Sequence, residues 1–196
     1  MTDIRRVAVF CGSNPGARPE YEAGARSLGK LLAARGIGVV YGGSSVGLMQ
    51  ALAETMVEED GEIIGVIPKM LVEREVANTA LEDLRIVGSM HERKAMMAGL
   101  ADGFIALPGG IGTLEEFFEI WTWAQLGVHE KPCGLLNLAG YYDPLLAFLD
   151  GAVEERFVRQ IHRDMVIVES DPGALLDRFA SYDPPRVVKW LNAGTI

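Results

Sequence analysis

Short apolar runs alternate along the chain with longer segments in which apolar residues recur at helical spacing. Each run holds four to six residues, which is typical of strands buried on both faces of a parallel sheet. The predicted strands cover residues 7–11, 37–41, 62–67, 84–87, 104–107, 133–137 and 165–168. The predicted helices cover residues 20–34, 48–59, 89–100, 117–124, 142–157 and 172–182. Residues 69–82 follow neither pattern and predict an irregular loop with one helical turn.

This alternation of strands and helices predicts the fold class. It indicates an α/β domain, formed by residues 1–196 as one unit, in which helices cover both faces of a parallel sheet. Sheets of this kind bind ligands at the carboxyl ends of strands, where the strand order reverses. Three loops that leave strand ends carry turn residues, near Ser13, near Ser44 and over 109–113. These loops are the candidate positions for a site.

The loop with the strongest signal for a binding site is Gly109-Gly110-Ile111-Gly112-Thr113, between a predicted strand and a predicted helix. A helix N-terminus offers unpaired N–H groups and a positive dipole end to an anion. Three glycines in four positions leave little side-chain bulk, so a phosphate can approach the main chain closely. A tight turn without a ligand is the alternative. Three glycines are more than such a turn requires, and the sequence therefore favours anion binding.

Glu116 follows this loop, about one turn into the predicted helix, and two interpretations of it stay open. Thr113-Leu114-Glu115-Glu116 fits a capping box, with Thr113 as the N-cap and Glu116 bonded back to its N–H. The other interpretation is a functional carboxylate beside whatever the glycine loop holds. The pattern alone does not separate the two.

A pair of basic residues lies in the helix predicted after Ser89. Lys94 falls on an apolar stripe that runs from Met90 to Ala101, and Arg93 lies at its border. Long basic side chains near an apolar face commonly extend their charged ends to water. The alternative is a cation directed into a cleft, where an arginine offers a planar fork to phosphate or carboxylate.

Composition narrows the classes of partner. The chain has 196 residues and a formal net charge of −9, which disfavours nucleic acids and anionic membranes as partners. No apolar run is long enough to span a bilayer, and no signal peptide is recognisable. The two cysteines, Cys11 and Cys133, fall in predicted strands and fit buried thiols in a reducing compartment. We therefore expect a cytoplasmic protein.

Several common motifs fail on spacing. The glycine loops match neither the dinucleotide fingerprint nor the Walker pattern, so no NAD, FAD or other cofactor is expected. Gly43-Ser44-Ser45-Val46-Gly47 matches the G-x-S-x-G of a nucleophile elbow, but the three histidines show no clear acid partner. No histidine has metal-ligand spacing, so no metal site is expected.

Taken together, these residues resemble the LONELY GUY family of cytokinin riboside 5′-monophosphate phosphoribohydrolases, once described as possible lysine decarboxylases. The combination of Arg93-Lys94 with the PGGxGTxxE loop is the specific part of the resemblance. The matching segments are Phe10-Cys11-Gly12-Ser13, Tyr41-Gly42-Gly43, Val46-Gly47-Leu48-Met49, Val66-Ile67-Pro68, His91-Glu92-Arg93-Lys94-Ala95, Pro108 to Glu116, and Thr122-Trp123-Ala124-Gln125-Leu126-Gly127.

The resemblance implies a Rossmann-like, doubly wound homodimer that cleaves a nucleoside 5′-monophosphate, such as AMP, to free base and ribose 5-phosphate. It implies that Arg93 and Glu116 are the catalytic pair. The implied substrate-binding residues are Glu75, Arg93, Lys94, Gly109, Gly110, Ile111, Gly112, Thr113, Glu116 and Thr122. Asn14, Ser44, Gln50 and Met96 depart from residues common in the family, which puts base preference rather than catalysis in question.

This chemistry suits the residues present. Cleavage of an N-glycosidic bond builds positive charge on the ribose, which a nearby carboxylate stabilises while it orients or deprotonates water. Glu116 is the one carboxylate clearly placed for that role. The helix after the glycine loop is apolar almost all round, which favours burial in a homodimer interface.

Two rival functions remain at this point. One is a nucleotide-binding or cofactor-binding carrier of the same fold without catalysis. The other is a decarboxylase, which needs a lysine bound to pyridoxal phosphate, and nothing in the sequence marks Lys94 as one.

Overall fold

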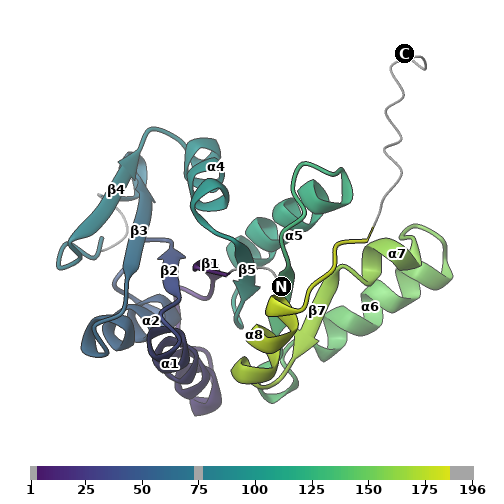
Figure 1. Cartoon of the computed structure of the whole chain (residues 1–196), viewed down its shortest axis with the longest axis horizontal. Coiled ribbons are helices and arrows are strands. Elements are labelled where there is room, and N and C mark those ends of the chain that lie inside the picture. The colour runs from purple at the N-terminus through teal and green to yellow at the C-terminus, as the bar shows by residue number, and fades with distance from the viewer. Residues whose placement is uncertain (1–3, 73–76, 186–196) are drawn as a thin grey trace.

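The computed structural model describes residues 4–72 and 77–185 (Figure 1). Seven strands form one sheet in which every neighbouring pair is parallel. The strands are β1 (Arg6–Phe10), β2 (Gly38–Tyr41), β3 (Ile63–Pro68), β4 (Asp83–Val87), β5 (Gly103–Ala106), β6 (Cys133–Leu136) and β7 (Val166–Glu169). Each predicted strand is confirmed to within one residue at either end.

The strand order is β4-β3-β2-β1-β5-β6-β7. The chain builds outward from β1 to β4, then returns to pair β5 with the other side of β1. The order therefore reverses between β1 and β5, where Val7 lies opposite Gly103 and Phe10 opposite Ala106. This doubly wound, Rossmann-like arrangement is the predicted fold class, and its reversal point brings the loops after β1 and β5 together.

Helices cover both faces of this sheet. The helices are α1 (Pro19–Ala34), α2 (Gly47–Glu58), α3 (Lys69–Val72), α4 (Met90–Leu100), α5 (Ile111–Gln125), α6 (Asp143–Glu154), α7 (Gln160–Arg163) and α8 (Pro172–Ala180), with a 3₁₀ turn η1 (Leu138–Gly140). Side chains of α1, α2 and α8 share one buried core with alternate strand residues. Side chains of α4, α5 and α6 share the core on the opposite face. Figure 1 shows α1 and α2 on the side of the sheet away from α4 and α5.

The predicted boundaries fail mainly at α5. This helix begins at Ile111 with Gly110 as its N-cap, so Thr113 lies inside the first turn. The capping-box interpretation of Thr113 and Glu116 is therefore wrong. Glycine is an acceptable N-cap. The helix start is nevertheless hard to recognise in the sequence, because Gly110-Ile111-Gly112 contains weak helix formers.

Smaller differences have local causes. The helix α6 ends at Glu154 rather than near residue 157, because Arg156 adopts a left-handed conformation with φ of 65°. The four-residue helix α7 was not predicted, since a single turn carries no detectable periodicity. The loop after β3 does hold one helical turn, α3, whereas Glu75 lies outside the described residues.

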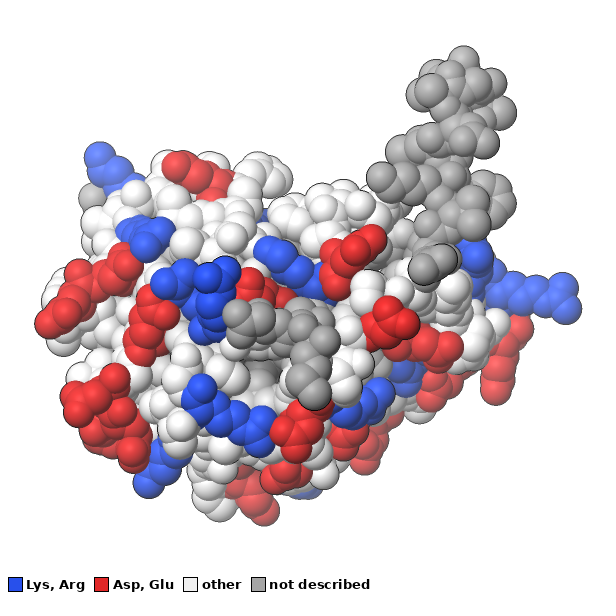
Figure 2. Space-filling view, viewed as in Figure 1, with Lys and Arg blue, Asp and Glu red and all other residues white. Residues whose placement is uncertain are grey.

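On the face drawn in Figure 2, acidic and basic side chains are interspersed rather than gathered by sign. Several exposed ion pairs belong to this pattern, including Arg6 with Glu62 and Arg178 with Glu169. Exposed pairs of this kind contribute little to stability, typically about 0–1 kcal/mol.

Candidate active site

The loops after β1 and β5 touch each other backbone to backbone at the reversal point. Gly12 N donates to Pro108 O at 3.0 Å, and Leu107 N donates to Phe10 O at 2.9 Å. A Cβ atom added at Gly12 would lie 3.4 Å from the Cα of Gly109, and one added at Gly109 would lie 2.9 Å from Gly12 N. Glycine is therefore required on both sides of this contact.

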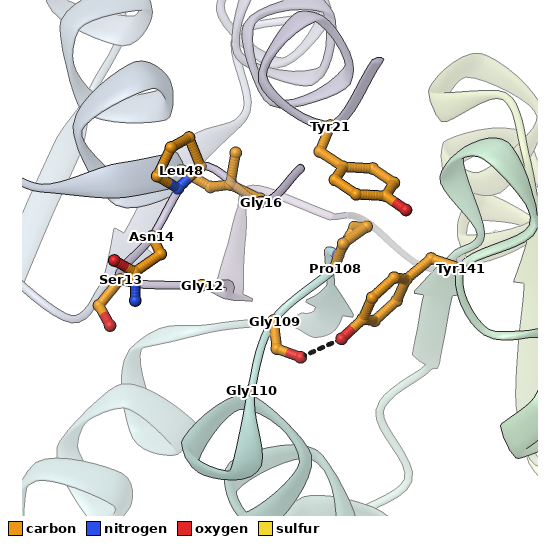
Figure 3. Close-up of a pocket in the computed structure, with 11 residues that line it drawn as sticks. Gly12, Ser13, Asn14, Gly16, Tyr21, Leu48, Pro108, Gly109, Gly110 and Tyr141 are labelled. Carbon is orange, nitrogen blue, oxygen red and sulfur yellow. Dashed lines mark hydrogen bonds between the residues drawn. The ribbon is translucent and has the colours of Figure 1, made fainter. Parts of the chain in front are cut away.

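A pocket of about 280 Å³ opens beside this contact (Figure 3). Tyr21 from α1 and Tyr141 from the turn after η1 supply aromatic rings on one side of it. The other walls come from the loops after β1 and β5 and from the first residues of α2. The lining residues are Gly12, Ser13, Asn14, Pro15, Gly16, Tyr21, Leu48, Pro108, Gly109, Gly110 and Tyr141.

The N-terminus of α5 adds a set of unpaired donors at the same place. Because the helix begins at Ile111, the N–H groups of Ile111, Gly112 and Thr113 have no acceptor within the helix. A Cβ atom added at Gly110 or at Gly112 would meet nothing within 4 Å. The space on the Cβ side of these two glycines is therefore open, and the positive end of the α5 dipole favours an anion at this terminus.

Arg93 projects from α4 toward the end of β2, and neither Arg93 nor Glu116 is among the residues that line the pocket. Ser89 is the N-cap of this helix, and its Oγ accepts the N–H of Glu92 at 3.1 Å. Arg93 is buried, and its Nη2 donates to Gly42 O at 3.3 Å. A Cβ atom added at Gly42 would collide with this guanidinium. The arginine is therefore directed into the protein at the end of β2 rather than along the surface to water.

Glu116 faces Arg93 from α5. The distance from its Oε1 to Arg93 Nη1 is 3.7 Å, and both side chains are almost entirely shielded, with exposures of 12% and 8%. At this separation the pair attracts by charge without a direct hydrogen bond. The Nε of Arg93 has no hydrogen-bond partner among the described residues. The guanidinium thus retains a donor beside a carboxylate.

The electrostatic influence of Glu116 extends to the end of β1. Burial raises the pKa of the Cys11 thiol far above its ordinary value, and the negative charge of Glu116 raises it further. Cys11 and Cys133 are both buried free thiols, as the sequence predicts. Since the thiolate is the reactive form, Cys11 is unsuited to act as a nucleophile at this site.

Lys94 lies next to Arg93 but is engaged by other carboxylates. Its Nζ is 2.5 Å from Glu115 Oε1 and 2.7 Å from Glu119 Oε2, both on α5. Burial lowers the pKa of Lys94, but hydrogen bonds and charge interactions with Glu115 and Glu119 outweigh it, so the pKa lies above its usual value. The lysine ties α4 to α5. Direct contact between Lys94 and a substrate stays a prediction.

The remaining candidates are Thr122, Ser44 and Glu75. Thr122 is on the exposed side of α5, and its hydroxyl donates to Phe118 O at 2.7 Å. Ser44 is fully buried, and its Oγ has no hydrogen-bond partner among the described residues. The nucleophile position of the G-x-S-x-G match is the next residue, Ser45, whose side chain is half-buried. Glu75 falls in the stretch that the structure does not describe.

Sequence reasoning missed three contributors to this region. Gly42 gives Arg93 its space, and Tyr21 and Tyr141 line the pocket. The glycine turn after β2 was a visible signal for Gly42. The tyrosines gave none, because their proximity depends on how α1 and η1 pack around the reversal point.

Two further properties of the described residues bear on the kind of site. Within 4–72 and 77–185, no group of three or more histidine, cysteine or acidic side chains is arranged to hold a metal ion. In the same ranges, no helix is long and apolar enough to cross a membrane.

Comparisons with known proteins identify close relatives. The family model described as "Possible lysine decarboxylase" matches residues 49–179. The chain is 49% identical over 181 residues to the cytokinin riboside 5′-monophosphate phosphoribohydrolase LOG of Oryza sativa subsp. japonica, covering 92% of this chain and 75% of that protein. It is 46% identical to the corresponding enzyme LOG3 of Arabidopsis thaliana, covering 92% of this chain and 84% of that protein.

Solved structures show the same fold at lower identity. The molybdenum cofactor binding protein of Rippkaea orientalis is 23% identical, with a TM-score of 0.68, covering 92% of this chain and 98% of that one. The molybdenum cofactor carrier protein of Chlamydomonas reinhardtii is 21% identical, with a TM-score of 0.67, covering 92% and 100%. At these identities the likeness supports the fold alone.

Proposed function

Because the chain belongs to the LONELY GUY family of cytokinin riboside 5′-monophosphate phosphoribohydrolases, we propose that it hydrolyses a nucleoside 5′-monophosphate to free base and ribose 5-phosphate. The observation that carries this proposal is the buried pair of Arg93 and Glu116 beside the N-terminus of α5. It joins a carboxylate, a fixed cation and an anion-binding loop within one region of the molecule.

The glycine loop holds the 5′-phosphate in this proposal. The N–H groups of Gly110, Ile111, Gly112 and Thr113 are the donors, and the α5 dipole favours the negative charge. The phosphate is remote from the bond that breaks, so its binding energy serves to position the ribose.

Glu116 acts on the ribose and on water. As the base departs, positive charge grows on the sugar, and a carboxylate beside it stabilises the transition state. The same carboxylate can orient or deprotonate the attacking water. Arg93 lies beside Glu116 and retains its Nε donor, so it binds and orients the nucleotide.

Further substrate contacts follow from the family resemblance. We assign Glu75, Lys94 and Thr122 to substrate binding, with AMP and isopentenyl-type cytokinin nucleotides as the substrate class. Lys94 also fixes α5 through Glu115 and Glu119, which supports the placement of Glu116.

The decisive variant is Glu116→Gln, which keeps the shape of the side chain and removes its charge. We expect the rate of adenine release from AMP to fall by about a hundredfold or more, because a sole catalytic group is lost. Chromatography of the reaction mixture measures this rate. The matched control is Glu58→Gln, an exposed carboxylate at the end of α2. Near-normal adenine release by Glu116→Gln would refute the role of Glu116.

A second pair of variants tests the phosphate loop. A Cβ at Gly110 meets no protein atom, so Gly110→Ala should fold normally yet raise KM for AMP by obstructing the anion. Gly151→Ala in α6 is the control, since its Cβ also meets nothing and it lies far along the chain from the loop. An unchanged KM in Gly110→Ala would contradict a phosphate at this position.

A non-catalytic carrier is the alternative function, suggested by the shared fold of the molybdenum cofactor proteins. Such a carrier would bind AMP without releasing adenine. The presence of the Arg93–Glu116 pair favours the enzyme, since binding alone requires no buried carboxylate near a bound anion. Chromatography of the AMP incubation separates the two functions.

A cytoplasmic homodimer completes the proposal. Leu126 and Val128, at the end of α5, are 59% and 67% exposed, which leaves apolar surface for a second copy of the chain. The buried thiols Cys11 and Cys133 suit a reducing compartment. The net charge of −9 disfavours nucleic acid as a partner.

A further inference from the structure

The carbonyl groups that lead into the glycine loop are bonded within the protein. Four successive carbonyls, from Leu107 to Gly110, each accept a hydrogen bond. The four bonds are Tyr142 Oη to Leu107 O (2.6 Å), Gly12 N to Pro108 O (3.0 Å), Tyr141 Oη to Gly109 O (2.5 Å) and Leu114 N to Gly110 O (3.1 Å). A carbonyl oxygen facing a bound anion would repel it, so these bonds keep negative dipole ends occupied elsewhere.

The bond from Tyr141 has a directional consequence. In a planar trans peptide, the C=O and the N–H point in opposite directions. Tyr141 holds the carbonyl of Gly109, and therefore the N–H of Gly110 points away from the tyrosine. The peptide between two glycines is otherwise easily rotated, because neither residue has a Cβ to restrict it. Figure 3 shows the Tyr141 hydroxyl directed at this carbonyl.

We propose that Tyr141 is a positioning residue, which fixes the Gly109–Gly110 peptide so that the N–H of Gly110 faces the bound phosphate. This role depends on one part of the proposed function, namely that the loop binds a phosphate. Tyr141 acts through the backbone of the loop, and the reacting atoms lie elsewhere.

Tyr141 is itself held by a rigid turn from another part of the chain. Asn137 Oδ1 accepts the N–H of Tyr142 at 2.7 Å, and Asn137 Nδ2 donates to Asp143 Oδ1 at 2.7 Å. Gly140 completes the turn with φ of 73°. The ring of Tyr141 packs edge to face against Tyr142 and against a tyrosine of α1, with ring centroids 5.1 and 5.5 Å apart.

Tyr142 provides a matched comparison within the same turn. Its hydroxyl makes the same kind of bond, to the carbonyl of Leu107. The peptide that follows Leu107 ends at Pro108, which has no N–H. The Tyr142 bond therefore anchors the loop without directing a donor, whereas the Tyr141 bond does both.

The test compares Tyr141→Phe with Tyr142→Phe, each of which removes one hydroxyl. Binding of inorganic phosphate is measured by calorimetric titration, and KM and kcat are measured with AMP. For Tyr141→Phe we expect phosphate affinity to fall and KM to rise by about threefold to tenfold, the usual effect of one hydrogen bond, with kcat changed by less than about twofold. For Tyr142→Phe we expect a lower melting temperature and a phosphate affinity close to that of the wild type.

Three results would overturn the inference. One is wild-type phosphate affinity in Tyr141→Phe. Another is an equal loss of affinity in Tyr142→Phe, since that would show a general loosening of the loop. The third is a wild-type protein that does not bind phosphate. If phosphate binds as expected but no nucleotide releases its base, the proposed function fails while the titrations still decide the role of Tyr141.

Discussion

Arg93 illustrates what can be predicted of a single residue and what cannot. Its position at the border of an apolar stripe left two outcomes open, a path to water or a place in a cleft. The choice depends on Gly42, which leaves room for the guanidinium, and on Glu116, which attracts it. These partners come from β2 and α5, so no local pattern around Arg93 could contain the answer. The chemistry of the site was therefore predictable, but its contacts were not.

The dependence of Arg93 on Gly42 gives a prediction at this scale. In Gly42→Ala, the new Cβ would collide with the end of the Arg93 side chain, which must move away from Glu116. Displacement of a catalytic group by about 1 Å costs up to about a hundredfold, so kcat/KM for AMP should fall by about tenfold to a hundredfold. Gly99→Ala, whose Cβ meets nothing, is the control. Unchanged activity in Gly42→Ala would show that Arg93 needs no fixed position.

The two cysteines give a second residue-scale prediction. Burial raises the pKa of the Cys133 thiol to about 12, and it raises the pKa of Cys11 as well. Because a raised pKa keeps a thiol protonated, neither should react with a disulfide reagent at about pH 8 in the folded protein. Both should react once guanidinium chloride unfolds the chain, which thiol titration measures. Rapid reaction of the native protein would contradict the burial of these groups.

Elements were predicted more reliably than contacts. Most strands are short apolar runs bounded by glycine, proline or polar residues, and such runs admit few alternatives in an alternating α/β chain. The start of α5 was missed because Gly110, Ile111 and Gly112 contain two weak helix formers, while Thr113 offered a familiar cap two residues later. The functional importance of the loop and its poor helix signal have the same cause, since both come from its glycines.

Lys94 couples two elements, and its removal should weaken their packing. In Lys94→Met, Glu115 and Glu119 lose a shared cation, and we expect the free energy of unfolding in urea to fall by about 2 kcal/mol. Since the pKa of Lys94 is raised, its contribution should be complete below its ordinary value of 10.5 and fade only in more alkaline solution. Lys69→Met, at an exposed position on α3, should change stability by less than about 0.5 kcal/mol. An equal effect of both substitutions would exclude a structural role for the Lys94 bridge.

At the scale of the whole molecule, the alternation of elements predicts a sheet but not its strand order. Alternating strands and helices are compatible with several orders, and only tertiary packing selects the one in which β5 returns to β1. The position of the site follows from that choice. Sequence reasoning could point to the loops near Ser13 and over 109–113, yet their contact through Gly12 and Pro108 had to be seen.

The homodimer is the prediction that belongs to this scale. Light scattering at micromolar concentration should give twice the 21.3 kDa mass of the chain. Leu126→Asp should shift the protein toward the monomer, because it places a charge on the apolar end of α5. Phe157→Asp, at a side chain 87% exposed beyond α6, should leave the dimer intact. A monomeric wild type, or dissociation by Phe157→Asp alone, would rule out an interface at α5.

The pairing of β1 with β5 also determines how early during synthesis the protein can bind a ligand. The two partners in this pairing stand almost a hundred positions apart, so the ribosome must deliver half of the chain before they can meet. Until then, a nascent chain contains the turn after β1 and the basic pair Arg93 and Lys94, but it does not yet contain Glu116. A nucleotide can therefore stabilise only chains in which β1 and β5, the strand pair farthest apart in the sequence, have met.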